Sequence, residues 1–288
     1  MSTSPSEHFI PFRSSRIHYS RWGTGDRLLF AFHGYGESAA SFGFLEEELG
    51  AAFTIVAIDL PFHGETEWED GFYFSPAELL KLLESIAAGL QGGADEVQSH
   101  LHSGAAWWLL GYSMGGRVAL QLLELAPQRI RRLVLLAPDG LQMNPWYWLS
   151  TQTGPGNRLF RWTMKRPGWL FFLLRTGHVL RIVNPSIFKF TVHYIDDTAV
   201  RDNLYARWTT MRGFRPHLRK IGACLRREGI LVHLIYGSYD RIIRWERGER
   251  FRRQHPDHCE LTLLPAGHQL LQPKFLEIIV KALNLPII

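Results

Sequence analysis

The sequence predicts an α/β fold with a mostly parallel central sheet flanked by helices, and two observations carry that prediction. Short apolar runs typical of strands alternate with segments of helical periodicity over most of the 288 residues, which is the pattern of a parallel sheet covered by helices. Within this alternation, a G-x-S-x-G motif at 111–115 stands between a strand-like run and a helical run. A serine on such a turn projects its hydroxyl from the backbone, so the motif also predicts a reactive group.

The individual elements follow from apolar runs, periodicity and cap residues. Ser75 and Pro76, for example, are typical of an N-cap and a first helical turn. Strands are expected at 27–32, 53–60, 105–110, 131–137, 230–236 and 259–264, and helices at 38–49, 76–90, 116–123, 245–255 and 273–283. Residues 91–104 are expected to form a loop or a frayed helix end.

The alternation of strands and helices stops in the middle of the chain. Residues 141–220 have few strand-like runs but many aromatic residues with helical spacing. Residues 140–220 contain thirteen Arg and Lys against three Asp, a net charge of +10 in a chain whose total is +5, so the remainder carries −5. Such an asymmetry indicates a segment with its own role. We therefore predict a core domain of residues 1–140 and 221–288, interrupted by a separate domain at 141–220.

Composition narrows the class of protein. A hydrophobic fraction of 46% supports a large core. The start of the chain, Met1 to Glu7, lacks the basic and apolar regions of a signal peptide, and no apolar run reaches the roughly 20 residues that a membrane span needs. Two distant cysteines, Cys224 and Cys259, are typical of reduced thiols that pack in a core rather than of a disulfide or zinc site. We expect a cytoplasmic protein.

Ser113, at the centre of the motif, needs a base to accept its proton and a third group to orient that base. His268 follows the last predicted strand, and Asp240 follows the strand before it. The carboxyl ends of parallel strands lie at one edge of the sheet, so Ser113, Asp240 and His268 are expected to converge there. The order Ser…Asp…His is that of the α/β-hydrolases.

The chain resembles the capped α/β-hydrolases. The matching pieces are H-G-Y-G-E-S (33–38), D-L-P-F-H-G (59–64), G-Y-S-M-G-G (111–116), G-S-Y-D (237–240) and G-H (267–268). The resemblance covers roughly residues 16–140 and 228–288. It implies that 141–220, inserted after the sixth strand, is a mainly helical cap (lid). It also implies an oxyanion hole made of two backbone N–H groups, those of Met114 and Tyr35.

Several residues have competing interpretations. Asp139 also ends a strand at the same edge and is the alternative acid, although Gly-x-x-Asp at Asp240 fits the family pattern better; the proline that usually follows that acid is missing. Asp59 is expected to bind nearby turn amides, and His33 and His63 to shape loops. His100 and His102 are expected to be solvated loop residues rather than metal ligands.

The predicted function is hydrolysis of a carbonyl compound, with a carboxylic ester as the first candidate, by a Ser-His-Asp triad through an acyl-enzyme, with no metal or organic cofactor. Carbon–carbon bond hydrolysis of diketone-type substrates is the first alternative, and a non-catalytic ligand-binding protein on the same fold is the second. The expected partner is a small, largely apolar substrate, for which the arginines of 141–220 suit an anionic group, and a nucleic-acid role is not expected. The spacing of the cap aromatics alone does not separate pocket lining, a small core and peripheral membrane contact, and the oligomeric state stays open.

Overall fold

The computed structural model describes residues 5–90, 106–179 and 196–284. Within these residues, one eight-stranded sheet has the order β1-β2-β4-β3-β5-β6-β7-β8. The strands are β1 (Ser6–Phe12), β2 (Ser15–Trp22), β3 (Arg27–Phe32), β4 (Phe53–Ile58), β5 (Trp107–Tyr112), β6 (Ile130–Leu136), β7 (Leu231–Gly237) and β8 (Cys259–Leu264). From β4 to β8 all neighbouring strands are parallel. The expected α/β fold with a mostly parallel sheet is confirmed.

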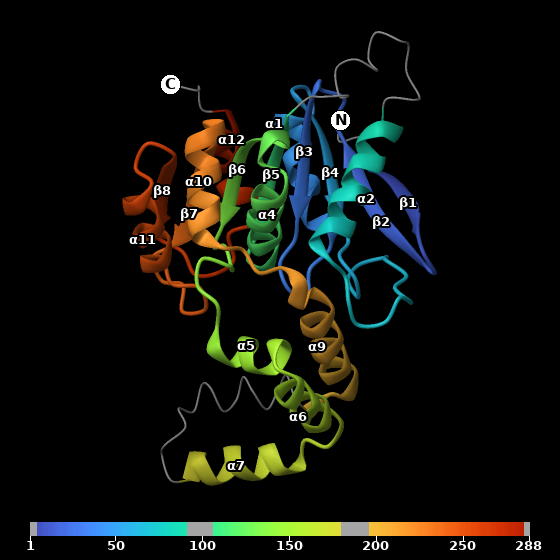
Figure 1. The fold of residues 1–288 in the computed structure, drawn as a ribbon. Coiled ribbons are helices and arrows are strands. Elements are labelled where there is room, and N and C mark those ends of the chain that lie inside the picture. Colours follow the sequence, from blue (N-terminus) through green and yellow to red (C-terminus); the bar gives the residue numbers. More distant parts are fainter. Residues whose placement is uncertain (1–4, 91–105, 180–195, 285–288) are drawn as a thin grey trace. The chain divides into compact units, whose positions relative to one another are not determined.

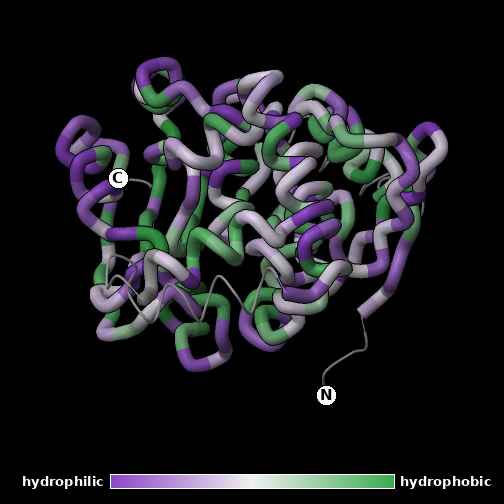
Figure 2. The backbone as a smooth tube through the Cα atoms, turned by 90° about the horizontal axis from the view of Figure 1, so that it is seen from below, coloured by the Kyte–Doolittle hydropathy of each residue, from purple (hydrophilic) through white to green (hydrophobic). Residues whose placement is uncertain are grey.

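Helices cover the sheet and bury its apolar side chains. They are α2 (Pro76–Gly89), α4 (Met114–Leu125), α10 (Leu218–Glu228), α11 (Glu246–Gln254) and α12 (Leu276–Asn284). Figure 1 shows α2, α4 and α10 side by side on one face of the sheet, and α12 packs against β6 from the other. Green hydrophobic and purple hydrophilic stretches alternate along the backbone in Figure 2. No helix among the described residues combines the length and the apolar character that crossing a bilayer requires.

Most of the helix caps and helix ends predicted from the sequence are found in the structure. Ser75 and Glu78 form a capping box, in which the N–H of Glu78 donates to Oγ of Ser75 and the N–H of Ser75 donates to Oε2 of Glu78. The expected helix at 38–49 is instead a 3₁₀ helix η1 (Ala39–Leu45) followed by the short α1 (Glu46–Leu49). The sequence of η1, with Gly, Ser and two Phe, has weak helix propensity. Similarly, a 3₁₀ turn η4 (Pro273–Phe275) precedes α12.

The hairpin of β1 and β2 was missed by sequence analysis. The two strands pair antiparallel from Ser6 with Arg21 to Phe12 with Ser15, and β2 continues the sheet by pairing with β4. Polar and apolar residues are mixed in both strands, and three of the buried residues of β2 are polar (Ser15, His18 and Ser20), so the apolar runs that identified the other strands are absent here. A polar cluster described below holds this hairpin to the end of β4.

The chain divides into two compact units. Unit 1 comprises Met1–Asp70, Ser75–Gln142 and Phe214–Ile288, and unit 2 comprises Gly71–Phe74 and Met143–Gly213. Cys224 and Cys259 of unit 1 are both free and buried, as expected of packing residues. The expected loop at 91–104, with His100 and His102, lies outside the described residues.

Unit 2 is helical and has a small aromatic core of its own. Its helices are α5 (Pro145–Gln152), α6 (Gly154–Lys165), α7 (Gly168–Val179) and α9 (Thr198–Thr210). Tyr147 and Phe160 both contact Trp208, at ring-centroid distances of 5.2 and 5.6 Å. The short segment 71–74 belongs here because the N–H of Phe74 donates to the carbonyl of Thr210 (3.0 Å). Of the aromatic residues of this segment, for which pocket lining, a small core and membrane contact were all considered, some thus form a core and others are exposed.

Candidate active site

Ser113 occupies the sharp turn between β5 and α4. Its backbone has φ 50° and ψ −113°, a region in which a non-glycine residue is strained. Because β5 runs through Tyr112 and α4 begins at Met114, the serine is the single residue between strand and helix. This is the elbow geometry that exposes a nucleophile.

The glycines around Ser113 are required by close packing. A Cβ on Gly115 would lie 1.9 Å from the carbonyl oxygen of Phe32, and one on Gly116 would lie 2.5 Å from Cβ of Pro138. A Cβ on Gly111 would lie 2.6 Å from the carbonyl oxygen of Gly115. A side chain on any of these three glycines would therefore clash with the backbone or side chains around the elbow.

His268 lies between the other two predicted residues. Its Nε2 is 3.0 Å from Oγ of Ser113, and its Nδ1 is 2.7 Å from Oδ2 of Asp240. All three residues belong to unit 1 and follow β5, β7 and β8, as the strand-end argument predicts. The structure brings Ser113, Asp240 and His268 together in one hydrogen-bonded chain.

Backbone contacts fix the loops that carry Asp240 and His268. The N–H of Tyr239 donates to the carbonyl of Ala266 (2.9 Å). A Cβ on Gly237 would lie 2.2 Å from the carbonyl oxygen of Gly267, so only glycine allows this approach. The hydroxyl of Tyr112 also donates to the carbonyl of His268 (3.2 Å). The backbone of the loop that carries His268 is thereby held from the ends of two strands, β5 and β7.

The hydrogen bonds of Asp240 stabilise its ionised form. Its Oδ1 accepts hydrogen bonds from the N–H groups of Ile242 (2.7 Å) and Ile243 (3.0 Å). Burial alone would raise the pKa of Asp240, but the hydrogen bond to His268 and these two amides outweigh it, so the pKa lies below its ordinary value. The residue can hold the Nδ1 proton of His268 and stabilise a positive charge on that ring.

Asp139, the alternative acid, has different partners. Its Oδ1 accepts from the N–H of Gly140 (2.8 Å), and its Oδ2 lies 3.6 Å from Nη1 of Arg117. Its own N–H donates to the carbonyl of Ser113 (2.8 Å). It supports the elbow through the backbone, while Asp240 is the carboxylate on Nδ1 of His268.

The loop after β3 contains the second predicted N–H donor, Tyr35. His33 stabilises this loop, because its Nδ1 donates to the carbonyl of Gly34 (2.8 Å) while its Nε2 accepts from the N–H of Leu60 (3.2 Å). His63 contacts the His33 ring at a centroid distance of 4.8 Å. Gly36 has φ 77°, which favours glycine. The expected loop-shaping roles of His33 and His63 agree with these contacts.

Glu37 is a second carboxyl near His268 that sequence analysis did not identify. Its Oε2 is buried without a hydrogen-bond partner among the described residues. Burial raises the pKa of Glu37, although the backbone of Gly34 and the charge of His268 act in the opposite direction. Glu37 also acts electrostatically on Tyr112, whose pKa is raised chiefly by burial. Its position in the motif at 33–38 was the available signal.

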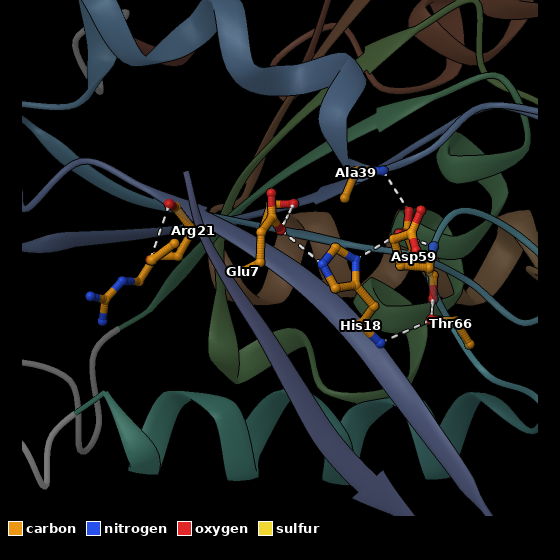
Figure 3. Close-up of polar contacts among 9 residues, drawn as sticks. Glu7, His18, Arg21, Ala39, Asp59 and Thr66 are labelled. Atoms are coloured by element: carbon orange, nitrogen blue, oxygen red, sulfur yellow. Dashed lines mark hydrogen bonds and ion pairs between the residues drawn. The ribbon is translucent and has the colours of Figure 1, made fainter. Parts of the chain in front are cut away.

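A second histidine, His18, stands between two carboxylates in the same unit. Figure 3 shows its ring between Glu7 of β1 and Asp59, which follows β4. Nδ1 lies 2.7 Å from Oδ2 of Asp59, and Nε2 lies 2.8 Å from Oε2 of Glu7. Asp59 also accepts from the N–H groups of Ala39 (2.6 Å) and Glu65 (2.9 Å). The expectation that Asp59 binds turn amides is confirmed, and its link to the hairpin is new.

Comparison with known proteins shows which family the chain matches and which proteins it is similar to. A model of the alpha/beta hydrolase family matches residues 28–275. An uncharacterized hydrolase, YugF, from Bacillus subtilis is 26% identical over 268 residues, 88% of this chain and 87% of that protein. The pimeloyl-[acyl-carrier protein] methyl ester esterase of Salmonella newport is 32% identical over 121 residues, 42% of this chain and 40% of that enzyme.

Some similarities cover only part of the relative. The acetyltransferase component of the acetoin cleaving system of Cupriavidus necator is 34% identical over 125 residues, and the match spans 43% of this chain but only 30% of that protein. Among solved structures, the thioesterase domain of the curacin biosynthetic pathway has a TM-score of 0.62 at 16% identity, covering 98% of this chain and 99% of that domain. A probable hydrolytic enzyme from Pseudomonas aeruginosa has a TM-score of 0.66 at 17% identity, covering 97% and 94%.

Proposed function

Because the chain belongs to the alpha/beta hydrolase family, we propose that it is a serine hydrolase that cleaves a carboxylic ester through an acyl-enzyme on Ser113. The observation that carries the proposal is the hydrogen-bonded chain in which His268 contacts Oγ of Ser113 at 3.0 Å and Oδ2 of Asp240 at 2.7 Å. Nucleophile, base and orienting acid are each within the reach that this chemistry requires.

The proposed reaction has two halves. Oγ of Ser113 attacks the ester carbonyl carbon while its proton passes to Nε2 of His268, and Asp240 stabilises the imidazolium. Collapse of the tetrahedral intermediate breaks the ester C–O bond, and His268 returns the proton to the departing alkoxide. Water then attacks the acyl-enzyme with His268 again as base, which releases the carboxylic acid and restores the serine hydroxyl.

Two backbone N–H groups are proposed to stabilise the oxyanion of each tetrahedral intermediate. Met114 is the first residue of α4, and the N–H groups of a first helical turn have no acceptor within the helix. The second donor is the N–H of Tyr35, in the loop that His33 and Gly36 shape. Loss of one such donor typically costs about 3 kcal/mol of transition-state stabilisation.

The relatives favour an acyl substrate. The Salmonella newport relative is named as a methyl ester esterase, and the curacin neighbour is a thioesterase domain; both names describe cleavage of an acyl bond to oxygen or sulfur. We therefore place ester hydrolysis ahead of carbon–carbon bond hydrolysis. The proposed substrate is a small molecule with an apolar body. We also propose that residues 141–220 form a lid over the active site and that arginines of this lid bind an anionic group of the substrate.

Labelling with a fluorophosphonate probe, followed by peptide mapping, tests the nucleophile. A single adduct on Ser113, absent in Ser113→Ala, is expected, since the probe reacts with activated serines. An ester series of increasing acyl length, run beside a diketone substrate, then separates the two hydrolytic reactions. An unlabelled Ser113 in folded protein would contradict the proposal and favour a non-catalytic ligand-binding protein.

A further inference from the structure

Unit 2 carries a row of apolar side chains on α6 and α7, of which all but the half-buried Trp169 are exposed. Leu159 and Trp162 are 51% and 47% exposed and lie one turn apart on α6, so they share a face. Trp162 stacks on Trp169 at a centroid distance of 5.8 Å. Phe172, 69% exposed, lies one turn beyond Trp169 on α7. We call Leu159, Trp162, Trp169 and Phe172 the apolar stripe.

Cationic side chains border the apolar stripe. Arg158, Arg161 and Lys165 follow one another at helical spacing along α6, beside Leu159 and Trp162. Arg166 and Arg175 lie at the end of α6 and on α7. All five side chains are exposed, and the sequence contains no Asp or Glu between residues 143 and 195. The helices therefore present positive charge without acidic residues of their own.

We propose that the apolar stripe and its five cations form a docking surface for an anionic lipid membrane. Trp and Phe at a helix surface insert into the boundary between headgroups and acyl chains, and Lys and Arg beside them bind anionic headgroups. Both halves of this chemistry are present on adjacent faces of the same helices. The proposed contact is peripheral, with α6 and α7 lying in the interface plane, since no helix among the described residues is long and apolar enough to cross a membrane.

Charge argues against a second copy of the chain as the occupant. A symmetric contact through the apolar stripe would bring the five cations of one copy close to those of the other, and like charges facing one another weaken association. An anionic membrane complements the same charges. A partner recognised by charge alone would not require the exposed aromatic row. The observations therefore favour a lipid surface.

Co-sedimentation with lipid vesicles tests the docking surface directly. The full chain is mixed with vesicles of phosphatidylcholine alone or with 30% phosphatidylglycerol, at low and high salt. We expect at least about tenfold stronger partitioning onto the anionic vesicles, weakened by salt because the charges are exposed. We also expect Trp162→Ala with Phe172→Ala, and separately Arg158→Gln with Arg161→Gln and Lys165→Gln, to lower this partitioning at least about fivefold each.

Matched variants on unit 1 control for loss of charge and of apolar surface. Arg219→Gln with Arg241→Gln and Arg250→Gln removes three exposed charges elsewhere, and Leu125→Ala with Leu263→Ala removes two exposed apolar side chains. These controls should bind vesicles as the unmodified chain does, and circular dichroism should show every variant folded. Equal binding to both lipid compositions, or equal losses in the controls, would overturn the proposal.

Sedimentation velocity tests whether a second copy of the chain occupies the apolar stripe instead of a membrane. A dimer of the unmodified chain that dissociates in Trp162→Ala with Phe172→Ala would assign the apolar stripe to a second copy and overturn the lipid proposal. Neither measurement requires turnover. The membrane-docking proposal can therefore be refuted while the hydrolase proposal stands, and the hydrolase proposal can be refuted while membrane docking is confirmed.

Discussion

Unit 1 contains two histidines that are held by carboxylates in nearly the same way. In each, Nδ1 lies 2.7 Å from an aspartate oxygen, Asp240 for His268 and Asp59 for His18. The difference lies at Nε2, which faces the hydroxyl of Ser113 in one cluster and the carboxylate of Glu7 in the other. A hydroxyl can give up its proton to an imidazole, whereas a carboxylate oxygen only accepts. The same pair of residue types thus suits proton transfer in one place and fastening of strands in the other.

Removal of each histidine in turn is expected to have the largest and most unequal effects. We expect His268→Gln to lower kcat for an ester substrate by at least about 10⁴-fold, since removal of a triad base leaves only oxyanion and binding contributions. His18→Gln should leave kcat of the folded protein within about threefold, because the site of His18 faces no nucleophile. Steady-state kinetics at matched folded fractions provides the measurement. Comparable losses of kcat in both variants would contradict the division of roles.

The two acids at the reactive cluster provide the next contrast. Asp240→Asn should lower kcat by about 10³- to 10⁴-fold, because the amide cannot stabilise the imidazolium and favours the wrong tautomer. Asp139→Asn should cost less than about tenfold, since Asp139 acts on the elbow through its backbone N–H. Kinetics of both variants with one ester decides between them, and the reverse order would make Asp139 the orienting acid.

The fastening role of the His18 cluster predicts a loss of stability. Asp59→Asn removes the charge of a buried carboxylate that binds His18 and two backbone amides, and we expect the free energy of unfolding to fall by about 3 kcal/mol. Glu67→Gln is the control, because Glu67 forms an exposed pair with Arg16 and such pairs are worth at most about 1 kcal/mol. Urea unfolding measures both. A larger effect at Glu67 would show that the hairpin is held elsewhere.

The smallest expected effect concerns Glu37 and the pH dependence of stability. Its pKa in the folded protein is raised above the ordinary 4.5, so the folded state binds the proton more tightly than the unfolded state. The contribution is therefore fully present below pH 4.5 and is lost as pH rises through the folded pKa. Asp240, with its lowered pKa, contributes stability that is lost only as pH falls below its ordinary value of 3.8.

Unfolding free energies of the native chain and Glu37→Gln, measured from pH 4 upward, test this sign. The native chain should lose stability relative to Glu37→Gln as pH rises through the folded pKa of Glu37, since glutamine does not titrate. Glu65→Gln serves as a control in a neighbouring loop. A constant difference across this pH range, or one that grows in the opposite direction, would show that Glu37 is not protonated preferentially in the folded state.

The sequence was most informative where function depends on a strand end. Ser113, Asp240 and His268 could be predicted to meet because each follows an apolar strand, and parallel strands end at one edge of the sheet. The hairpin of β1 and β2 could not be predicted in that way, because polar and apolar residues are mixed in its strands and because the contact of His18 with Asp59, which ties the hairpin to the end of β4, is long-range. Glu37 was visible in a motif, but only burial shows that it differs from an ordinary surface glutamate.

In unit 2, too, the sequence could not predict features that depend on tertiary packing. Helical spacing identified its aromatic residues but could not separate Tyr147 and Trp208, which form its core, from Trp162 and Phe172, which are exposed. The separation depends on which helices pack together, and this is a tertiary property. Residues 71–74 join the unit through the contact of Phe74 with Thr210, which no local pattern records.

The two native cysteines have a practical consequence for chemical labelling. Both thiols are free and buried, and burial raises the pKa of Cys259 to about 12; such a thiol reacts slowly with alkylating reagents, because the thiolate is the reactive form. The substitution Ser113→Cys would instead place a sulfur beside the imidazole of His268 at a half-buried, accessible position. A single fluorophore or spin label attached there would report on the occupancy of the site, with no need to remove either native cysteine.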